Sequence, residues 1–150
     1  MIPYRHSQVG KPIAIGTLLA AGLATVLVAS LSNTTIQAAP WLVIGLYGVL
    51  ALAYALFYRL TVTVDATRLR AAFGVGIFAK EVAIADVMAC EIVRTRRRWG
   101  WGIHWTPVGW LYNVGGRHAV RLMLRTERPV MIGSDQPEAL LAAIDAAREK

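Results

Sequence analysis

Charge is scarce in this chain, and one long stretch lacks it altogether. Only 17% of the 150 residues are charged, whereas about a quarter of the residues of a typical soluble domain are. Residues 12 to 58 contain no Asp, Glu, Lys, Arg or His. This absence divides the chain into an apolar N-terminal part and a charged C-terminal part.

Cysteine and histidine are also few, which argues against several kinds of chemistry. Cys90 is the single cysteine, so neither an intramolecular disulfide nor a cysteine-based metal site can form. It lies in an alternating segment without a neighbouring His, which is typical of a buried structural thiol rather than a nucleophile. His6, His104 and His118 lack the spacing of zinc ligands. We therefore expect no metal, no cofactor and no enzymatic activity.

Two long apolar runs lie within the uncharged stretch. The first extends from about residue 13 to 31 and the second from about 41 to 58. Each approaches the ~20 residues that a helix needs to cross a ~30 Å hydrocarbon core. The first run is longer than the apolar core of a signal peptide, so we expect it to remain as a span. A short uncharged connection ending at Pro40 then predicts a two-helix transmembrane hairpin over residues 1–58.

The charges beside these runs predict their orientation. Arg5 and Lys11 precede the first run, Arg59 follows the second, and the connection between the runs carries no charge. Loops that carry Lys and Arg stay on the cytoplasmic side of a membrane. The chain is therefore expected to be a multi-pass protein of the bacterial inner membrane with both termini in the cytoplasm.

Alternating apolar and polar residues replace the continuous apolar pattern after Arg59. Leu60, Val62 and Val64 share one face, with threonines between them, which is the period of a β-strand. Further strands are predicted over residues 68–73, 80–84, 88–95, 118–125 and 129–133. The side chains expected to face inward from the fourth of these six strands and the fifth are Met88, Cys90, Ile92, Val120, Leu122 and Leu124.

The end of the chain predicts one amphipathic helix. Asp135 and Glu138 have the spacing of a capping box, and Pro137 suits the first helical turn. An apolar stripe follows, formed by Leu140, Leu141, Ile144 and Ala147. Short antiparallel strands followed by one helix predict an α+β domain over residues 59–150, a bent sheet or small barrel closed by the helix.

Several motifs of this charged part resemble bacterial pleckstrin-homology-like domains. They are Leu60-Thr61-Val62-Thr63-Val64-Asp65, Leu69, Phe73-Gly74, Val82-Ala83-Ile84-Ala85-Asp86-Val87 and Ile132-Gly133-Ser134-Asp135-Gln136-Pro137-Glu138-Ala139-Leu140. The stretches Gly100-Trp101-Gly102-Ile103-His104 and Gly109-Trp110-Leu111-Tyr112-Asn113-Val114 are similar to those of a group of short members. The resemblance implies an antiparallel β-sandwich with a C-terminal helix, preceded by membrane helices. It implies no activity, because such a fold serves as a scaffold for lipid, peptide and self-association sites.

The charged part is basic, which bears on its partners. It holds 14 of the 16 basic residues and all nine acidic ones, so its net charge is +5. Positive charge beside a membrane anchor matches the anionic cytoplasmic leaflet. Nucleic-acid binding is the competing interpretation, but the basic residues are interleaved with strand residues and form only one short run. We therefore expect no nucleic-acid partner.

One segment, residues 94 to 112, combines arginine with aromatic residues and is called the Arg/Trp segment below. Its candidate binding residues are Arg96, Arg97, Arg98, Trp99, Trp101, Trp105, Trp110 and Tyr112. Indole rings favour the bilayer interface, and clustered arginines are attracted to anionic lipids. The segment is therefore a candidate for contact with lipid or with a protein. A structural role is the alternative, in which the tryptophans pack into the core or staple a long hairpin.

These observations favour a non-catalytic, membrane-anchored binding or scaffolding module. Its expected partners are the bilayer itself, other membrane proteins or further copies of the chain. The alternative function is recognition of anionic lipid headgroups through the Arg/Trp segment.

Overall fold

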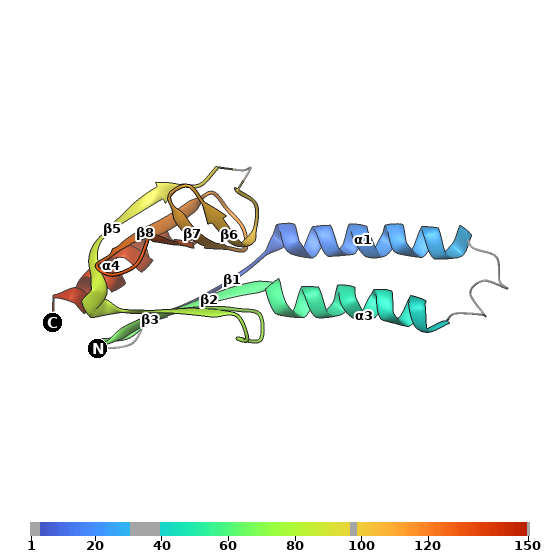
Figure 1. The fold of residues 1–150 in the computed structure, drawn as a ribbon, viewed down its shortest axis with the longest axis horizontal. Helices are drawn as coiled ribbons and strands as arrows, with labels where there is room; N and C mark the ends of the chain where they lie inside the picture. Colours follow the sequence, from blue (N-terminus) through green and yellow to red (C-terminus); the bar gives the residue numbers. More distant parts are fainter. Residues whose placement is uncertain (1–3, 31–39, 97–98, 150) are drawn as a thin grey trace.

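The computed structural model describes residues 4–30, 40–96 and 99–149. Two long helices extend from one end of a domain built of two sheets and a C-terminal helix (Figure 1). The elements are β1 (Tyr4–Val9), α1 (Lys11–Ser30), α3 (Pro40–Phe57), β2 (Arg59–Val64), β3 (Arg68–Phe73), β4 (Ala79–Ala83), the 3-10 turn η1 (Ile84–Asp86), β5 (Val87–Arg94), β6 (Gly102–Thr106), β7 (Gly109–Asn113), β8 (His118–Leu124), β9 (Val130–Gly133) and α4 (Pro137–Arg148).

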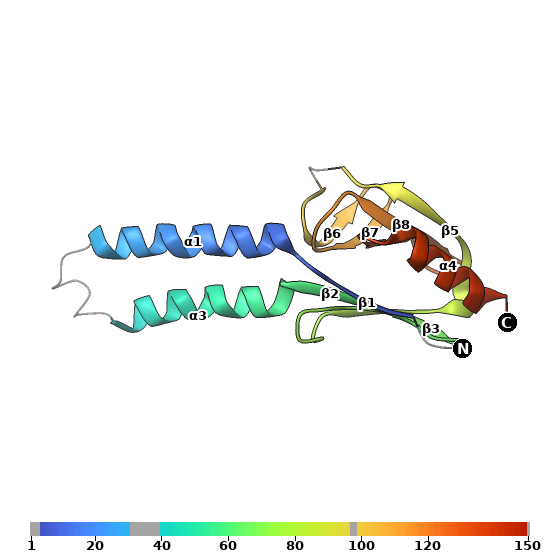
Figure 2. The same ribbon diagram turned by 180° about the vertical axis from the view of Figure 1, so that it is seen from behind.

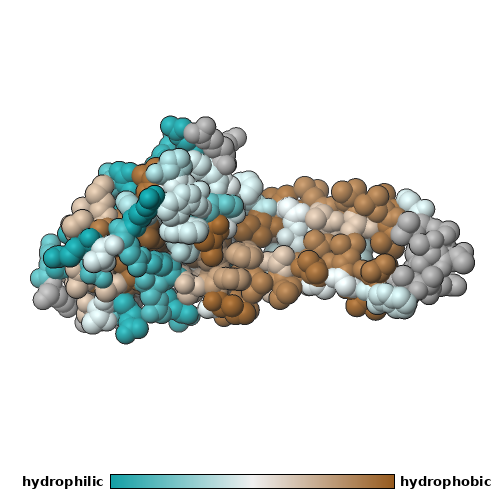
Figure 3. All heavy atoms as spheres, in the orientation of Figure 1, coloured by the Kyte–Doolittle hydropathy of each residue, from teal (hydrophilic) through white to brown (hydrophobic). Residues whose placement is uncertain are grey.

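The helices α1 and α3 match the two predicted apolar runs. Both are long and apolar enough to cross a membrane. Ala24 is the one buried residue of α1, and α3 has none. A core helix of a soluble domain would be mostly covered by protein, whereas these helices leave most of their large apolar side chains exposed, as the face in Figure 3 shows. The predicted connection between them falls in residues 31–39, outside the described residues.

The first sheet contains a strand that the sequence analysis did not anticipate. Its order is β1-β2-β3-β4, and all of its pairs are antiparallel. Strand β1 precedes α1 and pairs with β2 along six residues, from Tyr4 opposite Val64 to Val9 opposite Arg59. The sheet domain therefore includes residues from both sides of the helical hairpin, and a boundary at Arg59 leaves out its edge strand.

The second sheet corrects the expectation of a purely antiparallel arrangement. Its order is β5-β8-β9-β7-β6, and β7 pairs with β9 in parallel. Strands β6 and β7 form a hairpin in the region where no alternation was found, between residues 96 and 117. The remaining predicted strands are present, with ends shifted by at most a residue or so.

The core lies between the two sheets, where α4 also packs (Figures 1 and 2). Leu60, Leu69 and Phe73 of the first sheet are fully buried, as are Leu140 and Ile144 of α4. The predicted inward positions of β8 are confirmed, since the side chains of Val120, Leu122 and Leu124 are buried.

Strand β5 differs from its prediction. Met88 is 53% exposed and Ile92 is 37% exposed, so neither is a core residue. A bulge between Val87 and Ala89 makes Met88 an extra residue in the ladder with β8. Ile92 lies on β5, an edge strand of the second sheet. Cys90, between them, is half-buried against the core.

The predicted capping box of α4 is wrong. The N-cap residue is Gln136, and no side chain caps the helix there. The Asp135 carboxylate instead accepts a hydrogen bond from His6 Nε2 of β1 at 2.6 Å. Pro137 does occupy the first turn, as predicted.

Candidate functional site

The helices join the first sheet directly. Gly10 alone separates β1 from α1, and Tyr58 alone separates α3 from β2. The Gly10 amide donates a hydrogen bond to the Tyr58 carbonyl at 2.7 Å, so the pairing of the two strands continues to the start of the helices. A Cβ at Gly10 would lie 2.9 Å from the Val114 carbonyl oxygen, which explains the glycine. A single residue therefore connects each helix to its strand of the domain.

The Arg/Trp segment is divided among several surroundings. Arg97 and Arg98 lie outside the described residues, and Arg96 is exposed. Trp99 packs, half-buried, against a small second core on the outer face of the second sheet, formed by Leu111, Ala119 and Met131. The described residues of the segment therefore do not share one surface.

Three tryptophans are largely open to solvent. Trp101 is 51% exposed, Trp105 is 52% exposed and Trp110 is 41% exposed. Packing of these rings into the core is therefore excluded. Trp105 and Trp110 do join the two strands of the β6–β7 hairpin, where they are register partners with ring centroids 5.1 Å apart in an edge-to-face arrangement.

Trp105 and Trp110 belong to a cluster of aromatic and cationic side chains. The Arg128 guanidinium lies over the Trp105 ring, 5.1 Å from its centroid. Tyr112, one strand from the edge, is half-buried next to Phe73, and burial raises the pKa of its hydroxyl. We call Trp105, Trp110 and Arg128 the edge cluster, because β6 is an edge strand of its sheet.

Trp101 lies instead beside the ends of the helices. A hollow of about 330 Å³ separates the beginning of β6 from the helical hairpin. The hollow is lined by Ile13, Thr17, Ala53, Phe57, Trp101, Gly102, Ile103 and His104. The start of the β6–β7 hairpin and the domain ends of both helices therefore share one largely apolar surface.

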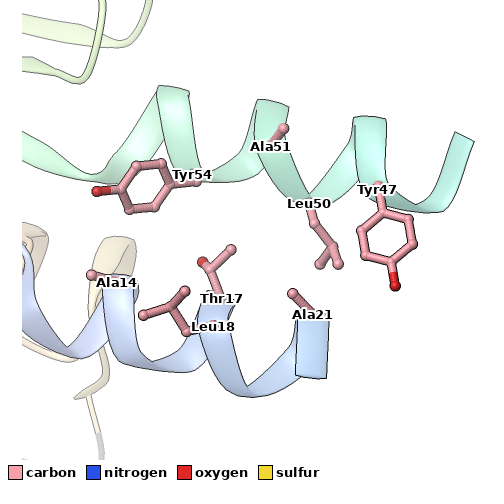
Figure 4. A pocket seen from close by; sticks show the side chains of 8 residues that line it. All are labelled: Ala14, Thr17, Leu18, Ala21, Tyr47, Leu50, Ala51 and Tyr54. Carbon is pink, nitrogen blue, oxygen red and sulfur yellow. The ribbon is translucent and has the colours of Figure 1, made fainter. Parts of the chain in front are cut away.

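A second apolar hollow lies between the helices themselves. It measures about 520 Å³ and is lined by Ala14, Thr17, Leu18, Ala21, Tyr47, Leu50, Ala51 and Tyr54 (Figure 4). Farther along, the hydroxyls of Thr25 and Tyr47 are hydrogen-bonded at 2.7 Å. The two helices thus touch through a few side chains and leave a groove between them.

A basic hollow that the sequence pattern does not predict lies on the outer face of the first sheet. It measures about 300 Å³ and is lined by Arg5, Arg59, Thr61, Thr63, Arg70, Ala72, Gly74, Val75 and Gly76. Arg5 and Arg59 had been interpreted only as charges that orient the helices. Their convergence depends on the pairing of β1 with β2, which the sequence pattern did not reveal.

The one thiol lies away from all of these surfaces. Cys90 Sγ donates a hydrogen bond to the Asp145 carboxylate of α4 at 3.1 Å. Burial and the neighbouring carboxylate raise the pKa of this thiol to about 11. Within the part of the chain that the structure describes, no group of three or more His, Cys, Asp or Glu side chains is arranged to hold a metal ion.

The geometry therefore defines a two-sheet domain carried on two apolar helices, with exposed aromatic and arginine side chains as its distinctive surface features. No protein-family model matches this chain, and no match is found among curated proteins or solved structures.

Proposed function

We propose that this chain is a non-catalytic, membrane-anchored module of the bacterial inner membrane. Its pleckstrin-homology-like domain faces the cytoplasm and mediates protein–protein contact or self-association beside the bilayer. The observation that carries this proposal is the exposed edge cluster of Trp105, Trp110 and Arg128, on a domain joined directly to two apolar helices.

Anchoring in a bilayer is supported by the surface of the helices. Large side chains along α1 and α3 are well exposed, among them Leu18 at 72% and Ile44 at 72%. An aqueous solvent would penalise so much contiguous apolar surface, whereas lipid tails accommodate it. The hydroxyls within α1 are satisfied internally, as bilayer burial requires: Thr17 and Thr25 each donate to a carbonyl four residues earlier.

A protein partner is supported by the composition of the edge cluster. Trp, Tyr and Arg are the residues that most often dominate the energy of protein interfaces. Trp105 and Trp110 contact each other edge to face, and a tryptophan side chain has only two χ angles to immobilise on binding. The cation over the Trp105 ring adds a charged group at the rim of the same surface.

Recognition of anionic lipid through the Arg/Trp segment is the second candidate function. It is favoured by the position of Trp101, which lines a hollow with Ile13 and Phe57 at the ends of the helices. A tryptophan at that level would lie where indole rings are enriched in membrane proteins. Arg94 and Arg96 are exposed in the same segment.

Photo-crosslinking in intact membranes tests both candidates. A photoreactive amino acid replaces Trp105, Trp101 or, as a control on the exposed side of α4, Ala139. We expect position 105 to give adducts of protein mass, either a second copy or one discrete partner, that disappear when Trp110→Ala and Arg128→Ala are introduced. Adducts of lipid mass at both tryptophan positions would favour the second candidate. If position 105 gives no more protein adduct than position 139, the association proposal is wrong.

A further inference from the structure

The basic hollow on the first sheet follows from the alternation of its strands. Even-numbered residues of β2 are buried in the core, so Arg59, Thr61 and Thr63 project from the opposite, outer face. Thr63 is paired with Arg5 of β1 on one side and with Arg70 of β3 on the other. The two arginines therefore flank one threonine hydroxyl across three adjacent strands.

Small residues on β3 and the turn that follows leave room between these long side chains. Ala72, Gly74 and Gly76 line the hollow, where larger side chains would fill it. Next to Arg5, the Ser7 and Thr61 hydroxyls are hydrogen-bonded to each other at 2.8 Å. The floor of the hollow thus combines hydroxyl groups with a cationic rim.

The positive charge of this hollow is only partly neutralised. Glu81 Oε1 lies 3.2 Å from Arg70 Nε, and the same carboxylate also pairs with Arg68. Among the described residues, no carboxylate lies within ion-pair distance of Arg5 or Arg59. Arg59 contacts the Gly74 carbonyl at 3.3 Å and lies over the Tyr58 ring. A phosphate oxygen would supply the negatively charged acceptor that the described residues do not provide for Arg5 or Arg59.

The hollow lies beside the end of an apolar helix. Tyr58 alone separates Arg59 from the end of α3. The turn between β3 and β4 is fixed there, because the Gly74 amide donates to the Arg59 carbonyl at 2.8 Å. A Cβ at Gly74 would collide with the carbonyls of Ala55 and Leu56, and its φ of +49° also favours glycine.

The tip of this turn is apolar and exposed. Val75 is 64% exposed and Ile77 is 71% exposed, while the Phe78 ring stacks on Phe57 of α3 with centroids 5.5 Å apart. The apolar surface of the helices continues onto the adjoining end of the domain (Figure 3). An apolar turn next to cations is suited to a bilayer interface, because its apolar side chains can enter the acyl region while the cations lie at the lipid phosphates.

We propose that the hollow formed by Arg5, Arg59 and Arg70 binds the phosphate of an anionic phospholipid of the leaflet in which the helices end. Val75 and Ile77 of the adjoining turn enter the acyl region of the same leaflet. This inference rests on the proposed membrane anchoring, but it concerns a surface separate from both the edge cluster and the Arg/Trp segment.

Lipid binding is tested on the full-length chain in detergent by native mass spectrometry. The probes are dioleoyl phosphatidylglycerol and dioleoyl phosphatidylcholine. We expect the anionic lipid to be retained preferentially. At about 1 kcal/mol per cation near the surface, Arg5→Gln or Arg59→Gln should weaken its binding by about fivefold and the double variant by about thirtyfold.

Matched variants keep this test decisive. Arg125→Gln removes the same charge from an exposed position after β8 and should leave retention unchanged. The Arg5 side chain makes no hydrogen bond or ion pair to another described residue, so Arg5→Gln tests binding without disturbing the turn. The proposal would be overturned if Arg125→Gln weakened retention of the anionic lipid as much as Arg5→Gln does, or if the anionic lipid were retained no better than phosphatidylcholine. It would also be overturned if inorganic phosphate competed for the hollow as well as the anionic lipid does.

Insertion of the turn is tested in nanodiscs with a fluorescent label on an introduced cysteine in a Cys90→Ser background. Lipids brominated near the top of their acyl chains should quench a label at Ile77→Cys but not one at Glu138→Cys. A label at Leu19→Cys in α1 reports the anchoring itself. Quenching at position 19 without quenching at position 77 overturns this inference alone, whereas no quenching at either position overturns membrane anchoring as well.

Discussion

Gln8 shows how one buried side chain connects distant parts of this fold. Its amide nitrogen donates to the Gly133 carbonyl at 2.7 Å, and its amide oxygen accepts from the Asp135 backbone nitrogen at 2.9 Å. Two backbone groups just before α4 therefore have their hydrogen bonds supplied by a residue of β1. A capping box is a local motif, and its prediction failed here because this tertiary contact and the His6–Asp135 pair replaced it.

Cys90 should react slowly with thiol reagents. Burial and the Asp145 carboxylate raise its pKa to about 11 from an ordinary value of 9.0, and the thiolate is the reactive form. At pH 8 the rate of alkylation by iodoacetamide should be about a hundredfold below that of an unperturbed thiol. The rate should rise with pH until the pH exceeds the raised pKa.

Two substitutions on α4 give opposite controls for this prediction. Asp145→Asn removes the negative charge that disfavours the thiolate, so alkylation should accelerate. Arg148→Gln removes a cation that favours the thiolate, so alkylation should slow further. Equal rates in the two variants would show that the α4 charges do not control this thiol.

At the scale of elements, the strands with the clearest alternation were those best predicted. Strands β2, β3 and β8 were found because a regular period of two marks a face that packs on a core. Strands β6 and β7 were missed because aromatic side chains lie on both sides of their turn without a regular alternation of apolar and polar residues. The parallel pairing of β7 with β9 joins strands that are distant in sequence, so no local pattern predicts it.

Strand β1 was missed for a different reason. Its six residues alternate in burial, but they precede a predicted membrane span, where Arg5 was interpreted as a topogenic charge. The basic hollow was missed with it, since Arg5 meets Arg70 only across the paired strands. The two apolar helices could be predicted from composition alone. The basic hollow beside them could not, because it exists only once the strands of the first sheet are paired.

The domain should need β1 to reach full stability. A fragment of residues 59–150 lacks Gln8 and its two hydrogen bonds, as well as the ladder with β2. A second fragment joins residues 4–10 to 58–150 through a short Gly/Ser linker, which the 2.7 Å hydrogen bond from Gly10 to Tyr58 allows. We expect it to exceed the first in unfolding free energy by at least about 2 kcal/mol, at about 1 kcal/mol per buried hydrogen bond.

Denaturant unfolding followed by circular dichroism measures this difference. Gln8→Ala in the joined fragment should fall between the two, because it loses the hydrogen bonds but keeps the strand. Equal stability of the two fragments would show that β1 is an accessory to the domain, and the predicted domain bounds of residues 59–150 would then hold.

At the scale of the whole molecule, the helical hairpin is an insertion between two paired strands. Strands β1 and β2 lie side by side, and the chain leaves the domain through α1 and returns through α3 (Figures 1 and 2). Any displacement of the helices is therefore transmitted to both strands at once. This connection supports a module whose domain keeps a fixed height and orientation on the membrane, as lipid contact and protein association there both require.

The same pairing restricts the topology of the chain in a membrane. Because β1 and β2 are hydrogen-bonded along six residues, the segments before α1 and after α3 must lie on one side of the bilayer. Arg5, Lys11 and Arg59 border the helices on that side, and because Lys and Arg are enriched in cytoplasmic loops we predict that this side faces the cytoplasm. A fluorescent-protein reporter fused before Met1 or after Lys150 should fluoresce, whereas alkaline phosphatase inserted near Thr35, outside the described residues, should be active. If the two termini lay on opposite sides of the membrane, the β1–β2 pairing itself would be contradicted. If both termini were exported, the fold would stand but the orientation would be reversed, and the basic hollow would not face the anionic cytoplasmic leaflet.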